Sequence, residues 1–332
     1  MWWAMRLVAN IIADMISTAR ERPPIRFSLQ AVQARSRHEW VELVRRADDT
    51  GFNMIVSADH LGGCLSPLLP LVTAAEVSDR LRLGVMVLNN DFYNPSLLAR
   101  SAATLDLLSD GRLELGLGAG HAKPEYDRAG LVFDAPGVRV ERLEEAVIVL
   151  RRLLEGDTVT FEGKHYRLTA EQCDPAPVQP RVPLLIGGGG RRVHRVAARH
   201  ADAVGFTGLG RALVDGQRHD PSGFRADRVD DDVAAVVAAA AERSSPLELQ
   251  VLVQSVVVTN DAHGAAEEIC RSRLPSLTTE DVLSTPYLMV GTATTLVDRI
   301  LEQRERWGFS HYTVRREALA QLGPVIESLA GR

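Results

Sequence analysis

The chain has 332 residues, of which 45% are hydrophobic and 24% charged, so it is long enough to bury a large core. Its formal net charge is −5 and its basic residues are scattered, which argues against a nucleic-acid-binding surface and favours a small-molecule ligand. The three cysteines form no Cys-x-x-Cys pair and cannot all pair with one another, which indicates a reduced, cytoplasmic compartment.

The first 24 residues resemble a secretion signal only superficially. Their apolar stretch is interrupted by Asn10 and Asp14, and no basic run precedes it. We interpret residues 1–24 as an N-terminal extension, with the folded domain beginning at residue 25. No later stretch is long and apolar enough to span a bilayer, so no contact with a membrane is expected.

The following part of the chain alternates strand and helix patterns four times. Predicted helices begin at Ser36, where Glu39 would complete a capping box, at Ser66, and at Asn94. Because parallel strands need crossover connections, this order indicates a parallel sheet covered by helices. The four predicted strands lie at 25–32, 53–60, 81–88 and 112–120.

The second half begins with a predicted helix at 138–156 and a hairpin at 158–168. Eight strands in this order, with no second compositional domain, predict one (β/α)8 TIM barrel over residues 25–332 rather than an open doubly wound sheet. The last four predicted strands lie at 182–188, 202–208, 249–258 and 311–315. We expect insertions around the ligand mouth near 122–137, 207–232 and 261–290; for the last two, disordered connections are an equal alternative.

Four consecutive glycines, Gly187 to Gly190, separate the fifth strand pattern from a helix pattern that begins with Arg191. A bare backbone at a helix N-terminus leaves N–H groups free, and the helix dipole there favours an anion. The pattern favours a phosphate site over a simple tight turn. It lacks the Gly-x-x-x-x-Gly-Lys-[Ser/Thr] sequence, so a nucleoside triphosphate loop is not expected.

Other candidate residues follow the second and fourth strand patterns, where the active site of a barrel is found. His60, beside Asp59, is the first acid–base candidate and His121 the second; the alternative for each is a hydrogen-bonded histidine without a catalytic role. The run 118–120 lacks dinucleotide spacing, and Pro124 stands where a crossover helix should run, so a flat ring against a bare strand end fits better. No metal-ligand pattern and no serine-nucleophile motif is present.

Taken together, these motifs resemble those of the luciferase-like monooxygenase family, and more closely its branch that depends on the deazaflavin coenzyme F420. The resemblance extends from about residue 25 to residue 329 and implies a TIM-like barrel, usually a homodimer, with a flavin or deazaflavin at the strand ends. It depends on the sequences "ADH" at 58–60, "LGVMVLNNDFYNPSLLARSAATLDLLSDGRLELGLGAGHAKPEY" at 83–126, "IGGGGRRVHRVAARHAD" at 186–202 and "MVGTATTLVDRI" at 289–300.

The resemblance also implies roles for individual residues. It implies a backbone bulge, in relatives a non-proline cis peptide, between Met86 and Val87 behind the central ring. The phosphate site corresponds to Gly187 to Gly190, and the active-site histidine to His60. The rest of the expected cofactor-binding set is Asp59, Asn89, Gly118, Ala119, Gly120, His121 and Arg191.

Two positions depart from the family pattern. Several relatives have a catalytic tryptophan where this chain has Cys64, and a glutamate proton donor where it has His121, so their sugar-phosphate oxidation is not carried over. We expect an F420-dependent oxidoreductase that transfers a hydride between the deazaflavin C5 and a small organic or peptide natural-product substrate, with an activated C=C or C=N as acceptor. The alternatives are an FMN-dependent monooxygenase that uses reduced flavin and oxygen, and a barrel that binds a ligand without turnover.

Overall fold

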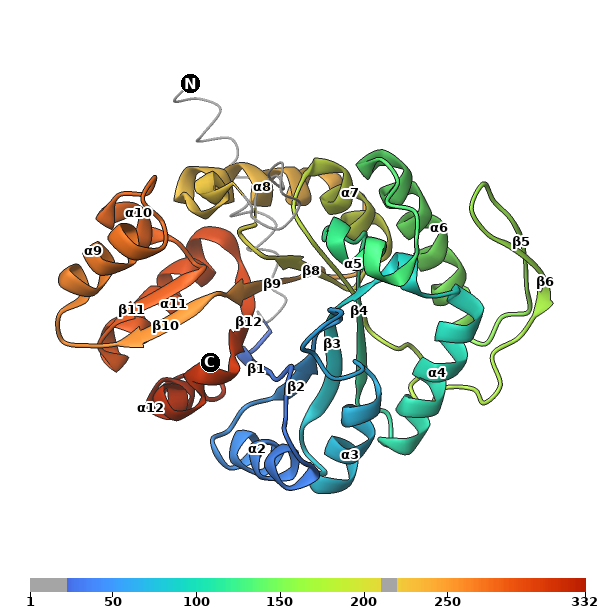
Figure 1. Ribbon diagram of the computed structural model, residues 1–332, viewed down its shortest axis with the longest axis horizontal. Coiled ribbons are helices and arrows are strands. Elements are labelled where there is room, and N and C mark those ends of the chain that lie inside the picture. The colour runs from blue at the N-terminus through green and yellow to red at the C-terminus, as the bar shows by residue number, and fades with distance from the viewer. Residues whose placement is uncertain (1–22, 210–219) are drawn as a thin grey trace.

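Eight parallel strands close into a barrel in the computed structural model, and helices surround them (Figure 1). The structure describes residues 23–209 and 220–332, so most of the predicted extension at 1–24 and part of the predicted insertion at 207–232 lie outside it. The predicted TIM barrel is confirmed, with all eight predicted barrel strands in place. Around the barrel they are β1 (Arg26–Gln30), β12 (Phe309–Arg315), β9 (Glu248–Val253), β8 (Ala203–Phe206), β7 (Leu184–Gly187), β4 (Leu113–Gly118), β3 (Arg82–Asn89) and β2 (Met54–Ser57).

The helices pack their apolar faces against the outside of the barrel. The first, α2 (Arg37–Asp49), begins after Ser36, whose hydroxyl accepts the N–H of Glu39 at 3.1 Å. The Glu39 carboxylate accepts from the N–H of Arg35, not of Ser36, so the predicted capping box is only half formed. No helix in the described part of the chain is long and apolar enough to cross a membrane. The larger helices that follow are α3 (Leu69–Val77), α4 (Pro95–Leu108), α6 (Pro136–Leu154), α7 (Arg191–His200), α8 (Ala226–Ala239), α11 (Ala293–Trp307) and α12 (Leu319–Leu329).

Two predicted helix starts have different outcomes. Helix α4 begins as predicted, because the side chain of Asn94 accepts the N–H of Ser96 at 3.0 Å and Pro95 occupies the first turn. Helix α3 begins at Leu69 rather than at Ser66, and no side chain caps it. Pro70 lies in its first turn, where the missing N–H costs no hydrogen bond.

Two of the predicted insertions contain more regular structure than their sequences indicate. The segment 122–137 contains helix α5 (Lys123–Ala129), and Pro124 lies in the first turn of that helix. The expectation that Pro124 excludes a helix there is wrong, because proline is tolerated in a first turn; the closed barrel is what excludes a dinucleotide fold. The segment 261–290 contains helices α9 (Ala262–Ser272) and α10 (Thr279–Ser284).

The predicted strand at 249–258 divides at Gln254. Its first part is β9 of the barrel, and its second part, β10 (Ser255–Val258), pairs in parallel with β11 (Leu288–Gly291), a strand that the sequence did not predict. This two-stranded sheet lies beside the barrel with α9 and α10 (Figure 1). The predicted hairpin is present as the antiparallel pair β5 (Val159–Glu162) and β6 (Arg167–Glu171) on the opposite side.

A cluster of charged side chains lies at the N-terminal end of the barrel. Arg26 on β1 donates to Glu114 of β4 at 2.8 Å and to Glu248 of β9 at 2.6 Å. Arg82 on β3 also pairs with Glu114, and Nδ1 of His311 on β12 lies 3.4 Å from a Glu248 oxygen. The cluster therefore links five of the eight strands through charge-assisted contacts.

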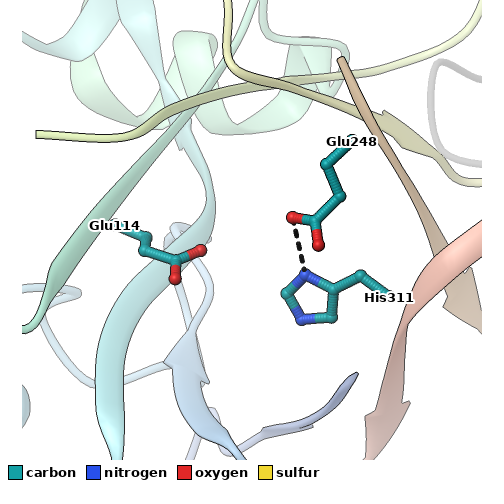
Figure 2. Close-up of side chains that lie close together, drawn as sticks. All are labelled: Glu114, Glu248 and His311. Carbon is teal, nitrogen blue, oxygen red and sulfur yellow. Dashed lines mark hydrogen bonds and ion pairs between the residues drawn. The ribbon is translucent and has the colours of Figure 1, made fainter. Parts of the chain in front are cut away.

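The arrangement of Glu114, Glu248 and His311 superficially suits a metal ion. Figure 2 shows their side chains converging from three strands. One ligand atom from each lies within 4.8 Å of the other two. The guanidinium of Arg26, however, already bridges the two carboxylates, and Arg82 pairs with Glu114. Two positive and two negative charges balance, so we interpret the cluster as a structural ion network.

This network should make folding stability depend on pH. Burial alone would raise the carboxyl pKa of Glu248, but the charges and hydrogen bonds of His311 and Arg26 outweigh it and lower the pKa to about 2; Arg26 likewise holds the pKa of Glu114 below its ordinary 4.5. A carboxyl group with a depressed folded pKa stabilises above its unfolded pKa, so this contribution should be lost as the pH falls from about 5 to about 2. Urea unfolding across that range should show a shallower loss in Glu248→Gln.

Removal of the central charge gives a second readout of the same network. Arg26→Met should lower the free energy of unfolding at neutral pH by about 3 kcal/mol, because it leaves two partly buried carboxylates short of a partner. Arg306→Met is the control, because it removes an exposed ion pair with Asp230 and should change stability far less. Equal losses in the two variants would show that the network does not stabilise the barrel.

Candidate active site

Both candidate histidines lie at the C-terminal end of the barrel, and the structure brings them together. His60 follows β2 and His121 follows β4, and their rings meet edge to face with centroids 5.6 Å apart. Nδ1 of His60 lies 2.8 Å from the carboxylate of Glu125 on α5. The His60 side chain is 46% exposed, whereas that of Glu125 is 12% exposed. The carboxylate thus fixes one ring nitrogen and leaves the other, Nε2, available to a ligand.

Glu125 is a residue that the sequence analysis missed. It belongs to a short helix inserted between β4 and the long helix α6, and no spacing rule connects such a helix to the end of β2. A glutamate in the first turn of a helix also has an ordinary explanation, since it complements the helix dipole. Only the fold shows that it is the partner of His60.

Asp59 and Asn89 connect the ends of neighbouring strands. The buried carboxylate of Asp59 accepts the N–H of Asn89 at 3.0 Å and a hydrogen bond from Tyr93, and burial raises the pKa of Asp59. The side chain of Asn89 accepts from the hydroxyl of Tyr126 at 3.0 Å. Both side chains hold the end of β3 in place, and direct contact with a cofactor stays a prediction for each.

The predicted bulge at Met86 and Val87 is present. Their peptide bond is cis, and the register between β3 and β4 shifts between Val85 and Leu88. The Met86 carbonyl accepts from the side-chain amide of Gln30 on β1 at 2.8 Å. The bulge is therefore held from across the barrel mouth.

The Val87 side chain explains two glycines that the sequence analysis assigned to the cofactor. A Cβ atom on Gly118 would lie 2.8 Å from Cγ2 of Val87, and one on Gly187 would lie 2.9 Å from Cγ1. Neither distance is tolerated between carbon atoms, so both positions must stay bare whether or not a ring binds there. Gly120 has φ of +72°, and a side chain there would overlap Tyr126 and Asn89. The Ala119 carbonyl accepts from Arg139 at 3.2 Å.

The glycine run connects β7 to α7, as predicted. Gly188 and Gly190 have φ of +146° and +95°, conformations that favour glycine, and Gly190 is the N-cap residue of α7. A Cβ on Gly189 would lie 2.6 Å from the Leu209 carbonyl oxygen, so the turn itself requires this glycine. A tight strand-to-helix turn, the alternative to a phosphate site, therefore explains part of the glycine run.

The remaining features of the run suit an anion. Gly189, Gly190 and Arg191 are exposed, and their N–H groups have no hydrogen-bond partner within the described ranges. A cavity of about 470 Å³ opens beside them, and Arg191 lines it without an ion pair to any described residue. Arg228, which also lines the cavity, is paired with Asp231, and Asp220 and Asp232 contribute further carboxylates to the lining. Free N–H groups at a helix N-terminus together with an unpaired arginine form the pattern of a phosphate site.

A sequence profile of the family described as luciferase-like monooxygenase matches residues 23–281. The chain belongs to the luciferase-like monooxygenase family. It is 33% identical over 213 residues to a protein of Intrasporangium calvum named F420-dependent glucose-6-phosphate dehydrogenase. The aligned region covers 60% of this chain and 64% of that protein. It is 35% identical over 170 residues to a protein of the same name from Amycolatopsis mediterranei, covering 49% and 51% of the two chains.

Solved structures of luciferase-like enzymes share the fold over almost the whole chain. A coenzyme F420-dependent tetrahydromethanopterin reductase from Methanopyrus kandleri superimposes with a TM-score of 0.73 at 20% identity, over 92% of this chain and 100% of the other. A monooxygenase from Streptomyces bottropensis gives 0.70 at 21% identity, over 91% and 97%. In sequence, by contrast, this family member spans only about half to two-thirds of the length of the curated relatives.

The contact between Val87 and Gly187 predicts a coupled stability effect. Gly187→Ala should destabilise the protein by about 1–3 kcal/mol, because the new methyl group meets Val87 and no other atom closer than 3.6 Å. In a Val87→Ala background the cost should fall by about 1 kcal/mol or more in a double-mutant cycle measured by urea unfolding. Gly323→Ala is the control, because its new Cβ would meet only Thr50 at 3.6 Å. Strict additivity would mean that Val87 is not the reason for the glycine.

Proposed function

We propose that this protein is an F420-dependent oxidoreductase that transfers a hydride between the deazaflavin C5 and a small organic or peptide natural-product substrate, reducing an activated C=C or C=N. The observation that carries the proposal is the gathering of three features at one barrel mouth: the bulge at Met86 and Val87, the bare N-terminus of α7, and the pair of His60 and Glu125. The names of the relatives from Intrasporangium calvum and Amycolatopsis mediterranei support the choice of coenzyme.

The residues present fit such a coenzyme. The N–H groups of Gly189, Gly190 and Arg191 are available to a phosphate. The space beside Gly190 is open, since a Cβ atom at that residue would have no neighbouring atom within 4 Å. Met86 and Val87 would support the ring, and Arg191 would add a charged contact to the phosphate. When bound in its reduced form, the deazaflavin supplies a hydride from C5.

His60 would provide the proton that accompanies hydride transfer. Its Nδ1 is held by Glu125, so Nε2 is the atom that donates to, or polarises, the substrate. The Glu125 carboxylate positions the ring through its contact with Nδ1. His121, in contact with the edge of His60, is the second candidate for the same role.

We propose that this protein shares the coenzyme of the named relatives, and not their reaction. The positions that carry tryptophan and glutamate in several family members are Cys64 and His121 in this chain. Sugar-phosphate oxidation therefore has no support from these residues. An FMN-dependent monooxygenase is the second candidate, because the similar structures include monooxygenases of comparable TM-score.

Coenzyme titration tests the proposal. Purified protein should bind F420 in a fluorescence titration more tightly than FMN. It should also oxidise no added organic substrate when supplied with reduced FMN and oxygen, the free flavin serving as the control because reduced FMN consumes oxygen without an enzyme. Arg191→Ala should weaken F420 binding about tenfold, the effect of one lost charge-assisted hydrogen bond. Arg195→Ala, which removes the same charge one turn further along α7, should bind as the wild type does.

Two outcomes would contradict the proposal. Tight FMN binding with oxygenation of a substrate that free reduced FMN leaves unchanged, and no binding of F420, would favour the monooxygenase. Equal F420 affinity in Arg191→Ala and Arg195→Ala, with normal melting of both, would place the phosphate away from the glycine run.

A further inference from the structure

Arg315 is the last residue of β12 and lies at the barrel mouth between two glutamines. Its guanidinium donates to the side-chain oxygen of Gln254 at 2.7 Å and to that of Gln30. The amide nitrogens of these glutamines are also engaged, with the Met86 carbonyl at 2.8 Å and the Thr207 carbonyl at 2.9 Å. Both amides are thus fixed with their oxygens toward Arg315, and the guanidinium has a defined position.

Arg315 forms no ion pair with any residue that the structure describes. Within residues 23–209 and 220–332, no carboxylate lies within 4.0 Å of its guanidinium, although Glu317 is two residues away. The next residue, Arg316, is paired with Glu39, and the partly buried Arg26 at the other end of the barrel is paired twice. A partly buried arginine without a carboxylate is unusual, and burial lowers the pKa of the Arg315 guanidinium. The Arg315 guanidinium therefore has no direct carboxylate partner among these residues.

The position of Arg315 distinguishes it from the coenzyme contacts. Strand β12 lies beside β1, which lies beside β2, whereas the glycine run follows β7, beyond β9 and β8 on the other side of β12. Arg315 interacts electrostatically with the thiol of Cys64. That thiol also interacts with the backbone of His60 and with the carboxylates of Glu125 and Asp59. The free positive charge thus belongs to the half of the mouth that contains His60.

We propose that Arg315 binds a carboxylate of the substrate, so that the hydride acceptor is an unsaturated or imino compound that carries a carboxylate group. The inference rests on the proposed function, since that function defines a substrate beside His60. Two of the five guanidinium N–H groups are taken by the glutamines, and the remaining donors suit the planar, two-oxygen geometry of a carboxylate. A neutral analogue of the same shape would leave the charge unpaired and bind more weakly.

Alkylation of Cys64 tests this charge without knowledge of the substrate. Cys64 is partly exposed, and iodoacetate and iodoacetamide are nearly the same in shape but differ by one negative charge. The ratio of their rates at Cys64, followed by peptide mass spectrometry, should fall about fivefold in Arg315→Gln and stay near the wild-type value in Arg315→Lys. Arg316→Gln is the matched control, because it removes a neighbouring charge that is already paired with Glu39. Cys270 in α9 serves as the reference site in the same samples.

The outcomes separate this inference from the proposed function. An unchanged ratio in a normally melting Arg315→Gln variant would overturn the inference whether or not F420 binds. If that variant does not fold, a second experiment on the wild type replaces it. Sodium benzoate should then slow iodoacetamide labelling of Cys64, and equal slowing by the neutral benzamide would overturn the inference. When saturating F420 is added, the dependence on Arg315 should persist; its loss would assign the arginine to the coenzyme. Failure of F420 to bind, with the ratio still dependent on Arg315, would remove the proposed function and leave the anion site.

Discussion

The barrel mouth is organised around the side chain of Val87. It fills the space between the ends of β4 and β7, and Gly118 and Gly187 must lack side chains because it is there. On the other side, Gln30 holds the Met86 carbonyl, and the same glutamine accepts from Arg315. One local distortion of β3 is thus packed against two strands and hydrogen-bonded to a third, which fixes the backbone at this point of the barrel mouth.

The pairing of charged side chains differs between the two ends of the barrel. At the N-terminal end, Arg26 and Arg82 are matched by Glu114 and Glu248, and the result is a balanced network. At the C-terminal end, Arg191 and Arg315 have no carboxylate partner among the described residues. Unbalanced charge costs stability unless a ligand compensates it, so this asymmetry is the pattern expected when one end serves folding and the other serves binding.

The strands of the barrel could be predicted from the sequence because each is a short apolar run bounded by turn or cap residues. Asn94 and Ser36 cap their helices through contacts two or three residues away, and such local signals are readable. The strand at 249–258 was predicted in one piece because the break at Gln254 depends on pairing with β11, in which Ser255 pairs with Leu288, 33 residues further along the chain. The local pattern of apolar residues is the same on both sides of that break.

The site was predictable only in part for the same reason. The glycine run and His60 stand at strand ends and could be located from the sequence. Glu125 and Arg315 could not, because their roles depend on side chains that approach from other elements. The sequence also does not show that Val87, 31 positions earlier, occupies the space beside Gly118. Contact of Gly118 with a cofactor stays a prediction. Local sequence patterns identify strand ends, and only the closed barrel shows what meets there.

A crystal structure of the protein soaked with F420 would test the central claim most directly. We expect the coenzyme phosphate within hydrogen-bond distance of the N–H groups of Gly189 to Arg191, and the deazaflavin ring against Met86 and Val87, with C5 facing His60. A ring that lies elsewhere, or a phosphate held by residues outside the glycine run, would contradict this placement of the active site.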